Sequence, residues 1–124
     1  MEIGIDIVEI NRIKKLCRKK RFLIRFFSDE ELSCIIDKRL FYSHLAGKFA
    51  AKEAVAKALG TGFRYFKWRD IQILNELNGK PYVVFTGKAH EIIKSRGIKK
   101  VLITISHSKE YAVAFAVAVG GAEY

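Results

Sequence analysis

The sequence has little of several features that would indicate other classes of protein. It contains one proline and no Gly-, Ser- or Pro-rich stretch, which argues against disorder and marks no linker between domains. No apolar run is long enough to span a bilayer, and Met1 is followed by an acid rather than by a basic and apolar leader. The two cysteines, Cys17 and Cys34, are too few for a disulfide framework, so we expect reduced packing residues. We therefore expect no membrane span, no signal peptide, and a single cytoplasmic domain over residues 1–124.

Acidic residues are in the minority. The chain has 13 Asp and Glu against 23 Lys and Arg, which gives a net charge of +10. A surplus this large indicates an anionic partner. Nucleic acid, an acidic protein, a phosphorylated small molecule and an anionic membrane all remain open at this point. The plainer alternative is that the charge serves only solubility.

Hydrophobic and turn patterns predict an α+β fold, with a mainly antiparallel sheet packed against a long central helix. The alanine-rich segment 45–60 is expected to be that helix. A basic helix should begin at an Asn11 N-cap, and another at Ser28, where Glu31 completes a capping box. Asn78-Gly79 favours a hairpin turn. A short helix is expected over residues 89–95, and strands are expected over residues 3–10, 71–74, 82–85, 101–105 and 111–119.

Three charged residues stand out because they lie in otherwise apolar segments. Asp6 interrupts a β-branched strand, although Asp is depleted in strands and costly to bury unpaired. Glu53 and Lys57 lie four residues apart in the alanine-rich helix, in one row with Phe49. An ordinary surface ion pair would explain Glu53 and Lys57 alone. With Asp6 added, two carboxylates and a lysine indicate a site, because Mg²⁺ is typically held by one or two carboxylates, waters and substrate phosphates.

A polar corner, Ser106-His107-Ser108, ends a third apolar segment. Small hydroxyls and an imidazole beside backbone N–H groups suit the binding of a phosphate. No Walker loop, kinase signature or G-x-G-x-x-G sequence is present. Taken from the residues alone, the pattern indicates a magnesium-assisted enzyme of the phosphoryl-transfer type.

Two motifs resemble those of a known family. Gly4-Ile5-Asp6 is similar to its first motif, G-I-D, and FAAKEAVAK over residues 49–57 is similar to its second, an aromatic followed by x-x-K-E-x-x-x-K. Further segments occur in the family's order: RFFSDEEL, WRDIQI, NGKPYV and ITISHSKEYAVAFAV. Over nearly its whole length, the chain therefore resembles the short 4'-phosphopantetheinyl transferases, a family with a single such domain.

The resemblance implies a reaction. The phosphopantetheine arm of coenzyme A would pass to a serine of an acyl carrier protein for fatty-acid synthesis, and 3′,5′-ADP would leave. Asp6 and Glu53 would hold Mg²⁺, or Mn²⁺ in its place, and Lys57 would stabilise or protonate the departing phosphate. Asp6, Glu53 and Lys57 are thus the expected catalytic residues. The base that takes the serine proton stays open between Asp6, Glu53 and a metal-bound water.

The resemblance also implies where the two substrates bind. Coenzyme A is expected to contact Arg39, Lys48, Lys57, Gly60, Thr61, Gly62, Ser106, His107 and Ser108. The acidic carrier protein is expected to meet the basic helix at Arg12, Lys15, Leu16, Arg18, Lys19, Arg21, Phe22 and Arg25. The chain is expected to form a homotrimer with sites at the subunit interfaces.

Two other functions compete with this one. A small nucleic-acid-binding protein would account for the basic charge and the aromatic residues. Most of the aromatic residues lie in apolar runs, however, and Asp6 and Glu53 would have no role, so neither nucleic acid nor a membrane is expected as a partner. A non-catalytic module that binds the carrier protein would keep the basic helix but would not need Asp6, Glu53 and Lys57.

Overall fold

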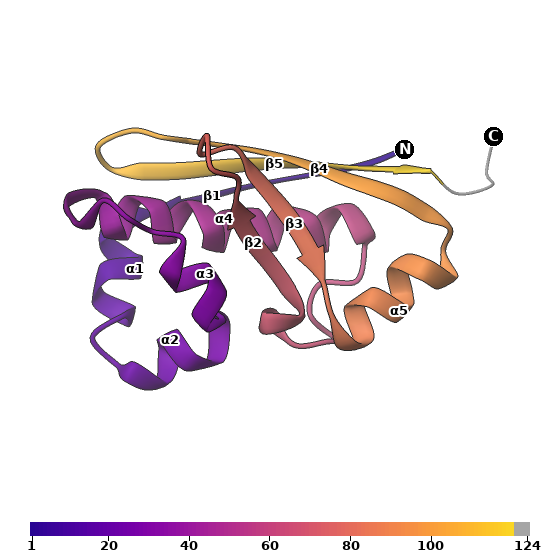
Figure 1. The fold of residues 1–124 in the computed structure, drawn as a ribbon, viewed down its shortest axis with the longest axis horizontal. Helices are drawn as coiled ribbons and strands as arrows, with labels where there is room; N and C mark the ends of the chain where they lie inside the picture. Colours follow the sequence, from indigo (N-terminus) through magenta and orange to yellow (C-terminus); the bar gives the residue numbers. More distant parts are fainter. Residues whose placement is uncertain (121–124) are drawn as a thin grey trace.

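Three antiparallel strands form the larger sheet, in the order β1-β5-β4 (Figure 1). They are β1 (Glu2–Glu9), β4 (Ile98–His107) and β5 (Tyr111–Gly120) in a computed structural model that describes residues 1–120. Residues 121–124, the end of the predicted domain, lie outside the described part. A second sheet pairs β2 (Ile71–Asn75) with β3 (Pro81–Phe85), also antiparallel. The predicted α+β class is confirmed, with the antiparallel strands divided between two sheets.

The long helix α4 (Phe41–Leu59) lies directly against the inner face of the three-stranded sheet (Figure 1). Both contact surfaces are built from small residues. Most of α4 is buried, and the inward positions of β5 are all alanine: Ala112, Ala114, Ala116 and Ala118. Small side chains let a helix approach a sheet closely, which brings groups on α4 near groups on the strands. The helix ends at Gly60, whose φ of 73° is the left-handed conformation typical of a C-cap.

The helix start differs from the prediction. A 3-10 helix, η1 (Lys38–Leu40), runs straight into α4, so α4 begins four residues before the predicted residue 45. The remaining elements are a second 3-10 helix, η2 (Trp68–Asp70), and α5 (Gly87–Ser95), which agrees with the predicted short helix.

The predicted basic helix is wrong in two respects. The N-cap is Glu9, with Asn11 inside the helix, and the segment divides into α1 (Ile10–Leu16) and α2 (Lys20–Phe26). The chain turns at residues 17–19, and this lets Phe22 and Phe26 of α2 pack against Phe49 of α4. Tertiary packing therefore divides a segment whose local sequence is compatible with a single helix. The next helix, α3 (Asp29–Ser33), has the predicted capping box between Ser28 and Glu31.

Both cysteines are free thiols. Burial raises the pKa of Cys17 to about 11, so its reactive thiolate form is disfavoured at neutral pH. A packing role for Cys17, as predicted, agrees with this environment. Within residues 1–120, no helix is both long and apolar enough to cross a membrane.

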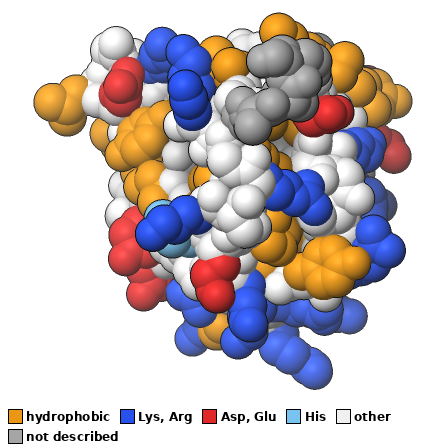
Figure 2. Space-filling model, turned by 90° about the vertical axis from the view of Figure 1, so that its right-hand side faces the viewer, with side chains coloured by type: hydrophobic (Ala, Val, Ile, Leu, Met, Phe, Trp, Pro, Cys, Tyr) orange, Lys and Arg blue, Asp and Glu red, His pale blue; other side chains and the backbone are white. Residues whose placement is uncertain are grey.

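The outer face of the three-stranded sheet is apolar and open to solvent. Ile3, Ile5, Ile7, Leu102 and Phe115 are exposed large hydrophobic residues on this face. In Figure 1 the helices and the two-stranded sheet all lie on the opposite, inner side of the sheet. Figure 2 shows one end of the molecule, where Lys and Arg side chains crowd the lower edge, away from the sheet. The molecule therefore has an apolar side and a basic side.

Candidate active site at the contact of strand β1 and helix α4

Gly4 determines how closely β1 approaches α4. A Cβ at this position would lie 2.0 Å from the carbonyl oxygen of Ala54 and 2.7 Å from the backbone nitrogen of Ala58. Both are backbone atoms of α4, so only glycine fits without moving the strand or the helix. Because side chains alternate along a strand, Asp6 lies on the same α4-facing side as Gly4. The glycine and the aspartate of the G-I-D motif thus have a joint geometric reason.

Asp6 and Lys57 form an ion pair across this contact. The Nζ atom of Lys57 donates to Oδ1 of Asp6 at 3.0 Å and to the carbonyl oxygen of Ile5 at 3.0 Å. The Asp6 side chain is 18% exposed and that of Lys57 is 53% exposed. The pair is therefore open to solvent on the lysine side, where a phosphate could reach the ammonium group.

Glu53 lies beside this pair and differs from Asp6 in having no hydrogen-bond partner within residues 1–120. Burial raises the pKa of Glu53, and the negative charge of Asp6 raises it further, while Lys57 and Arg12 act in the opposite direction. Two neighbouring carboxylates thus repel each other, and one lacks a partner. A cation between them would relieve both effects.

This donor set fits Mg²⁺. Among residues 1–120 no group of three or more His, Cys, Asp or Glu side chains is placed to hold a metal, so any ion here has two protein carboxylates at most. Mg²⁺ is usually held by one or two carboxylates, with water and substrate phosphates completing its shell. Asp6 and Glu53 are the residues that would hold it.

A hollow of about 400 Å³ adjoins Lys57 at the end of α4. It is lined by Lys57, Gly60, Arg96 and Glu2 among others. Thr61 is buried, and its hydroxyl donates to the carbonyl oxygen of Gly62; among residues 1–120, neither residue is part of the lining of this hollow. Of the predicted glycine loop, Gly60 is thus the residue that lies next to the ion pair.

Two of the residues predicted to hold the nucleotide end of coenzyme A, Lys48 and His107, lie elsewhere. They line a second hollow of about 210 Å³ together with Asn75 and with His44, which the sequence did not single out. Burial lowers the pKa of His44, and the nearby His107 and Lys48 lower it further. A cluster that disfavours additional positive charge favours an anion.

Lys48 and Ser108 already have partners within the chain. The Nζ atom of Lys48 donates to Oδ1 of Asn75 at 2.7 Å and to the carbonyl oxygen of Ile73 at 2.5 Å, and the side chain is buried. The Ser108 hydroxyl accepts from the backbone N–H groups of Glu110 and Tyr111, which shapes the β4–β5 turn. Arg39 is largely exposed and lies 3.6 Å from Asp37. Contacts of these residues with coenzyme A stay predictions.

The two hollows lie on opposite sides of α4. Asp6 belongs to β1 and His107 to β4, the two edge strands of the sheet. On the helix, Lys48 and Glu53 are five residues apart, which is about 140° around the axis. One chain therefore does not bring the predicted nucleotide residues and the carboxylates together on one side of the helix.

The predicted carrier-protein residues lie along α1, α2 and the turn between them. The six basic members are exposed: Arg12, Lys15, Arg18, Lys19, Arg21 and Arg25. Leu16 and Phe22 are half-buried, and the ring of Phe22 packs 4.6 Å from that of Phe26. Arg12 is also close enough to influence the pKa of Glu53, so the basic surface begins at the carboxylate site itself.

A sequence profile described as the 4'-phosphopantetheinyl transferase superfamily matches residues 2–116. The chain belongs to this superfamily. A holo-(acyl-carrier-protein) synthase of Caldanaerobacter subterraneus is 48% identical over 120 residues, which are 96% of this chain and 94% of that protein. The predicted family, and with it the prediction of an enzyme, are confirmed.

Solved structures of transferases of this superfamily share the fold. A holo-(acyl-carrier-protein) synthase of Neisseria meningitidis has a TM-score of 0.86 and 35% identity, covering 95% of this chain and 97% of that one. The synthase of Helicobacter pylori, solved in complex with coenzyme A, has a TM-score of 0.81 and 36% identity, covering 94% and 99%.

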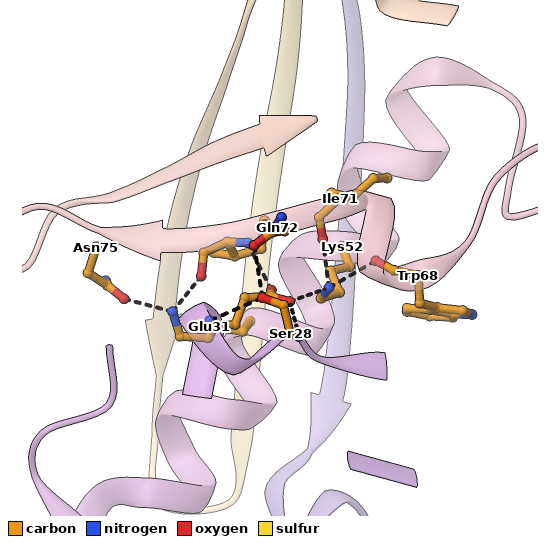
Figure 3. A network of polar contacts seen from close by, with 9 residues as sticks. Ser28, Glu31, Lys52, Trp68, Ile71, Gln72 and Asn75 are labelled. Carbon is orange, nitrogen blue, oxygen red and sulfur yellow. Dashed lines mark hydrogen bonds and ion pairs between the residues drawn. The ribbon is translucent and has the colours of Figure 1, made fainter. Parts of the chain in front are cut away.

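Sequence reasoning missed a buried ionic network of this transferase (Figure 3). Lys52, the residue before Glu53, is fully buried, and its Nζ atom donates to Oε1 of Glu31 at 2.8 Å. It also donates to the carbonyl oxygens of Trp68 and Ile71 at 2.9 and 2.6 Å. Burial lowers the pKa of Lys52 to about 8.

The partner carboxylate is equally well satisfied. Glu31 accepts from the backbone N–H groups of Ser28 and Ile73 at 3.0 and 2.8 Å (Figure 3). The network thus joins α3, α4, η2 and β2, and it anchors the helix turn that carries Glu53. The lysine of the K-E motif was visible as a charge in an alanine-rich helix, but nothing local identifies its partner 21 residues away.

Proposed function

We propose that the chain transfers the 4'-phosphopantetheine group of coenzyme A to a serine of apo acyl carrier protein. The observation that carries this proposal is the convergence of Asp6, Glu53 and Lys57 at one β1–α4 contact. The similarity to holo-(acyl-carrier-protein) synthases, one of them solved with coenzyme A, supports the choice of substrates.

The reaction exchanges one P–O bond for another. The serine oxygen forms a bond to the pantetheine-side phosphorus of the pyrophosphate, the bond from that phosphorus to the bridging oxygen breaks, and 3′,5′-ADP leaves. Lys57 donates hydrogen bonds to the departing phosphate, where negative charge develops. Its half-exposed ammonium can turn from Asp6 toward a phosphate without being pulled out of the core.

Asp6 and Glu53 have the complementary role. They would hold Mg²⁺, which when bound would supply positive charge against the pyrophosphate and help to orient it. The serine proton has to pass to a base, and the two carboxylates are the basic groups of this chain that lie at the site. Gly4 keeps them within reach of each other by holding β1 against α4.

Coenzyme A is proposed to bind between two copies of the chain, and the assembly to be a homotrimer. The carboxylates and the His107 hollow lie on opposite sides of α4, so a ligand that touches both kinds of group is best held by two subunits. The exposed apolar face of the sheet supports such self-association. The carrier protein docks on the basic surface of α1 and α2. The proposed setting is fatty-acid synthesis in the cytoplasm.

Intact-mass spectrometry tests the reaction directly. Apo carrier protein is incubated with this protein, coenzyme A and Mg²⁺, with an EDTA sample in parallel. We expect a mass gain of one phosphopantetheine arm that EDTA abolishes. No gain with several carrier proteins and a folded enzyme would contradict the transfer, and a gain that survives EDTA would contradict the metal.

Asp6→Ala tests the site within the same assay. Turnover should fall by on the order of 1,000-fold, because the carboxylate is part of the charge arrangement around the reacting phosphate. Glu9→Ala is the matched control, since Glu9 is an exposed acid on the same strand. Equal activities of the two variants would exclude Asp6 from the site.

A further inference from the structure

The segment between α4 and β2 combines aromatic and basic residues in a way that the proposed function has not used. Residues 63–69 read FRYFKWR. The structure gathers Phe63, Phe66, Lys67, Trp68 and Arg69 of this segment with Arg25 of α2 around a hollow of about 530 Å³. We call this hollow the aromatic-basic groove.

The floor of the groove is a packed cluster of rings. The Trp68 ring stacks on that of Phe63, with centroids 3.7 Å apart and planes 8° apart, and on that of Phe49 at 4.9 Å and 17°. The Phe26 ring packs edge-on against that of Trp68, with centroids 4.6 Å apart. Because the chain's own rings stack on the indole, a nucleotide base has no free indole face to stack on, which disfavours a nucleic acid as the occupant.

The rim of the groove carries positive charge that the chain does not neutralise. Arg25, Lys67 and Arg69 are exposed, and within residues 1–120 none of them forms an ion pair. Among residues 1–120, no acidic side chain is part of the lining of the groove. An apolar floor with unpaired cations around it is complementary to an acidic protein surface that presents an apolar side chain.

The groove lies close to Glu53, one of the residues of the proposed active site. Phe49, under the indole, lies one helix turn before Glu53 on the same row of α4. Arg25 belongs both to the groove and to the basic surface of α1 and α2. A protein that docks on α2 and brings a serine to Glu53 therefore has this groove directly beside its path.

We propose that the aromatic-basic groove is a second docking surface for the acidic acyl carrier protein, and this inference rests on the proposed function. Lys67 and Arg69 pair with carboxylates of the carrier, and the ring edges of the floor receive one of its apolar side chains. The surface for the carrier thereby extends from α2 across the segment that follows α4.

Trp68 is the single tryptophan of the chain, so its fluorescence reports on the groove. A tryptophan-free apo carrier protein is titrated into this protein, and we expect the Trp68 emission to change with saturation. The test variant is Lys67→Ser/Arg69→Ser. The matched control is Lys88→Ser/Lys94→Ser, which removes the same charge from exposed positions of α5.

The groove variant should weaken carrier binding and raise the KM for the carrier by about tenfold, as expected for the loss of two charge contacts at an interface. The KM for coenzyme A should stay unchanged, and the control variant should change both values by less than about twofold. Equal weakening by the two variants, unchanged affinity of the groove variant, or constant emission of Trp68 would each overturn the proposal. The proposal would also be overturned if coenzyme A changed the Trp68 emission and the groove variant lost that change, because coenzyme A would then be the occupant of the groove.

The proposed transfer reaction and the proposed role of the groove can each be contradicted without contradicting the other. Active wild-type enzyme with an unaffected groove variant contradicts the groove alone. A wild-type protein that binds the carrier through the groove without transferring the arm contradicts the transfer alone, because fluorescence measures binding without turnover.

Discussion

Asp6 could be identified from the sequence as a candidate site residue because a charged side chain is unusual in an apolar strand. Packing alone does not explain a carboxylate among β-branched residues. The structure explains it by placing Lys57 and Glu53 beside Asp6. The role of Gly4 was not derivable in the same way. Its constraint comes from the Ala54 carbonyl, 50 residues further along the chain, so only the assembled fold shows it.

Gly4→Ala tests whether the close approach of β1 and α4 builds the site. The added methyl group would overlap backbone atoms of α4, so we expect the free energy of unfolding to fall by about 2 kcal/mol. Turnover should fall as well, because the strand that carries Asp6 has to move. Urea denaturation and the mass assay measure the two effects.

Gly47→Ala is the control for this variant. Its Cβ would meet the Cγ2 atom of Ile105 at 2.7 Å, which is a side-chain atom rather than backbone. Alanine also favours a helix interior over glycine by about 0.5–1 kcal/mol, which offsets part of the overlap. Stability losses of the same size in both variants would show that Gly4 has no special role.

At the scale of elements, the features that could be predicted are those determined by residues close together in the sequence. The capping box at Ser28, the end of α4 at Gly60 and the hairpin strands all follow from neighbours within a few residues. The division of the basic segment into α1 and α2 has no such local signal, since residues 17–19 contain neither proline nor glycine. It depends on rings of α4 and η2 that pack against α2.

The Glu31–Lys52 pair is the strongest test of how the elements are held together. Lys52→Met leaves the Glu31 carboxylate buried with only backbone donors, so the free energy of unfolding should fall by about 3–5 kcal/mol. Glu31→Gln/Lys52→Met should cost less than the two single changes added together, because the partners are coupled. Urea denaturation of the four proteins gives this coupling energy.

Lys57→Met provides a contrast on the same helix. Its ion pair with Asp6 is half-exposed, so its loss should cost less than about 1 kcal/mol while turnover collapses. A Lys52→Met variant as stable as Lys57→Met would contradict a structural role for the buried pair.

At the scale of the whole molecule, the two sides differ in the kind of partner that they suit. The basic side, with α1, α2 and the aromatic-basic groove, suits an acidic protein. The apolar outer face of the sheet suits another copy of the chain, since large exposed apolar surfaces usually mark contact sites. Alternation along the strands could not identify the inner face. β5 is apolar on both sides, and in β1 the isoleucines lie on the outer side while Asp6 lies on the inner side, so only the position of α4 shows which side is inner.

Leu102→Glu tests the assembly without touching the carboxylate site. Leu102 is 51% exposed and lies on β4, two strands away from Asp6. A charge within an apolar interface should convert the proposed trimer into monomers, as measured by light scattering after size-exclusion chromatography. Turnover should fall with the trimer, because in the proposed assembly the carboxylates and the His107 hollow that hold one coenzyme A come from different copies.

Ile36→Glu is the matched control for this assembly test, since Ile36 is 87% exposed but lies outside the sheet. It should keep both the trimer and the activity. A Leu102→Glu protein that is monomeric yet fully active would contradict the shared site, because it would show that one chain holds coenzyme A and transfers its arm alone. A Leu102→Glu protein that remains a trimer would instead move the interface away from the outer face of the sheet.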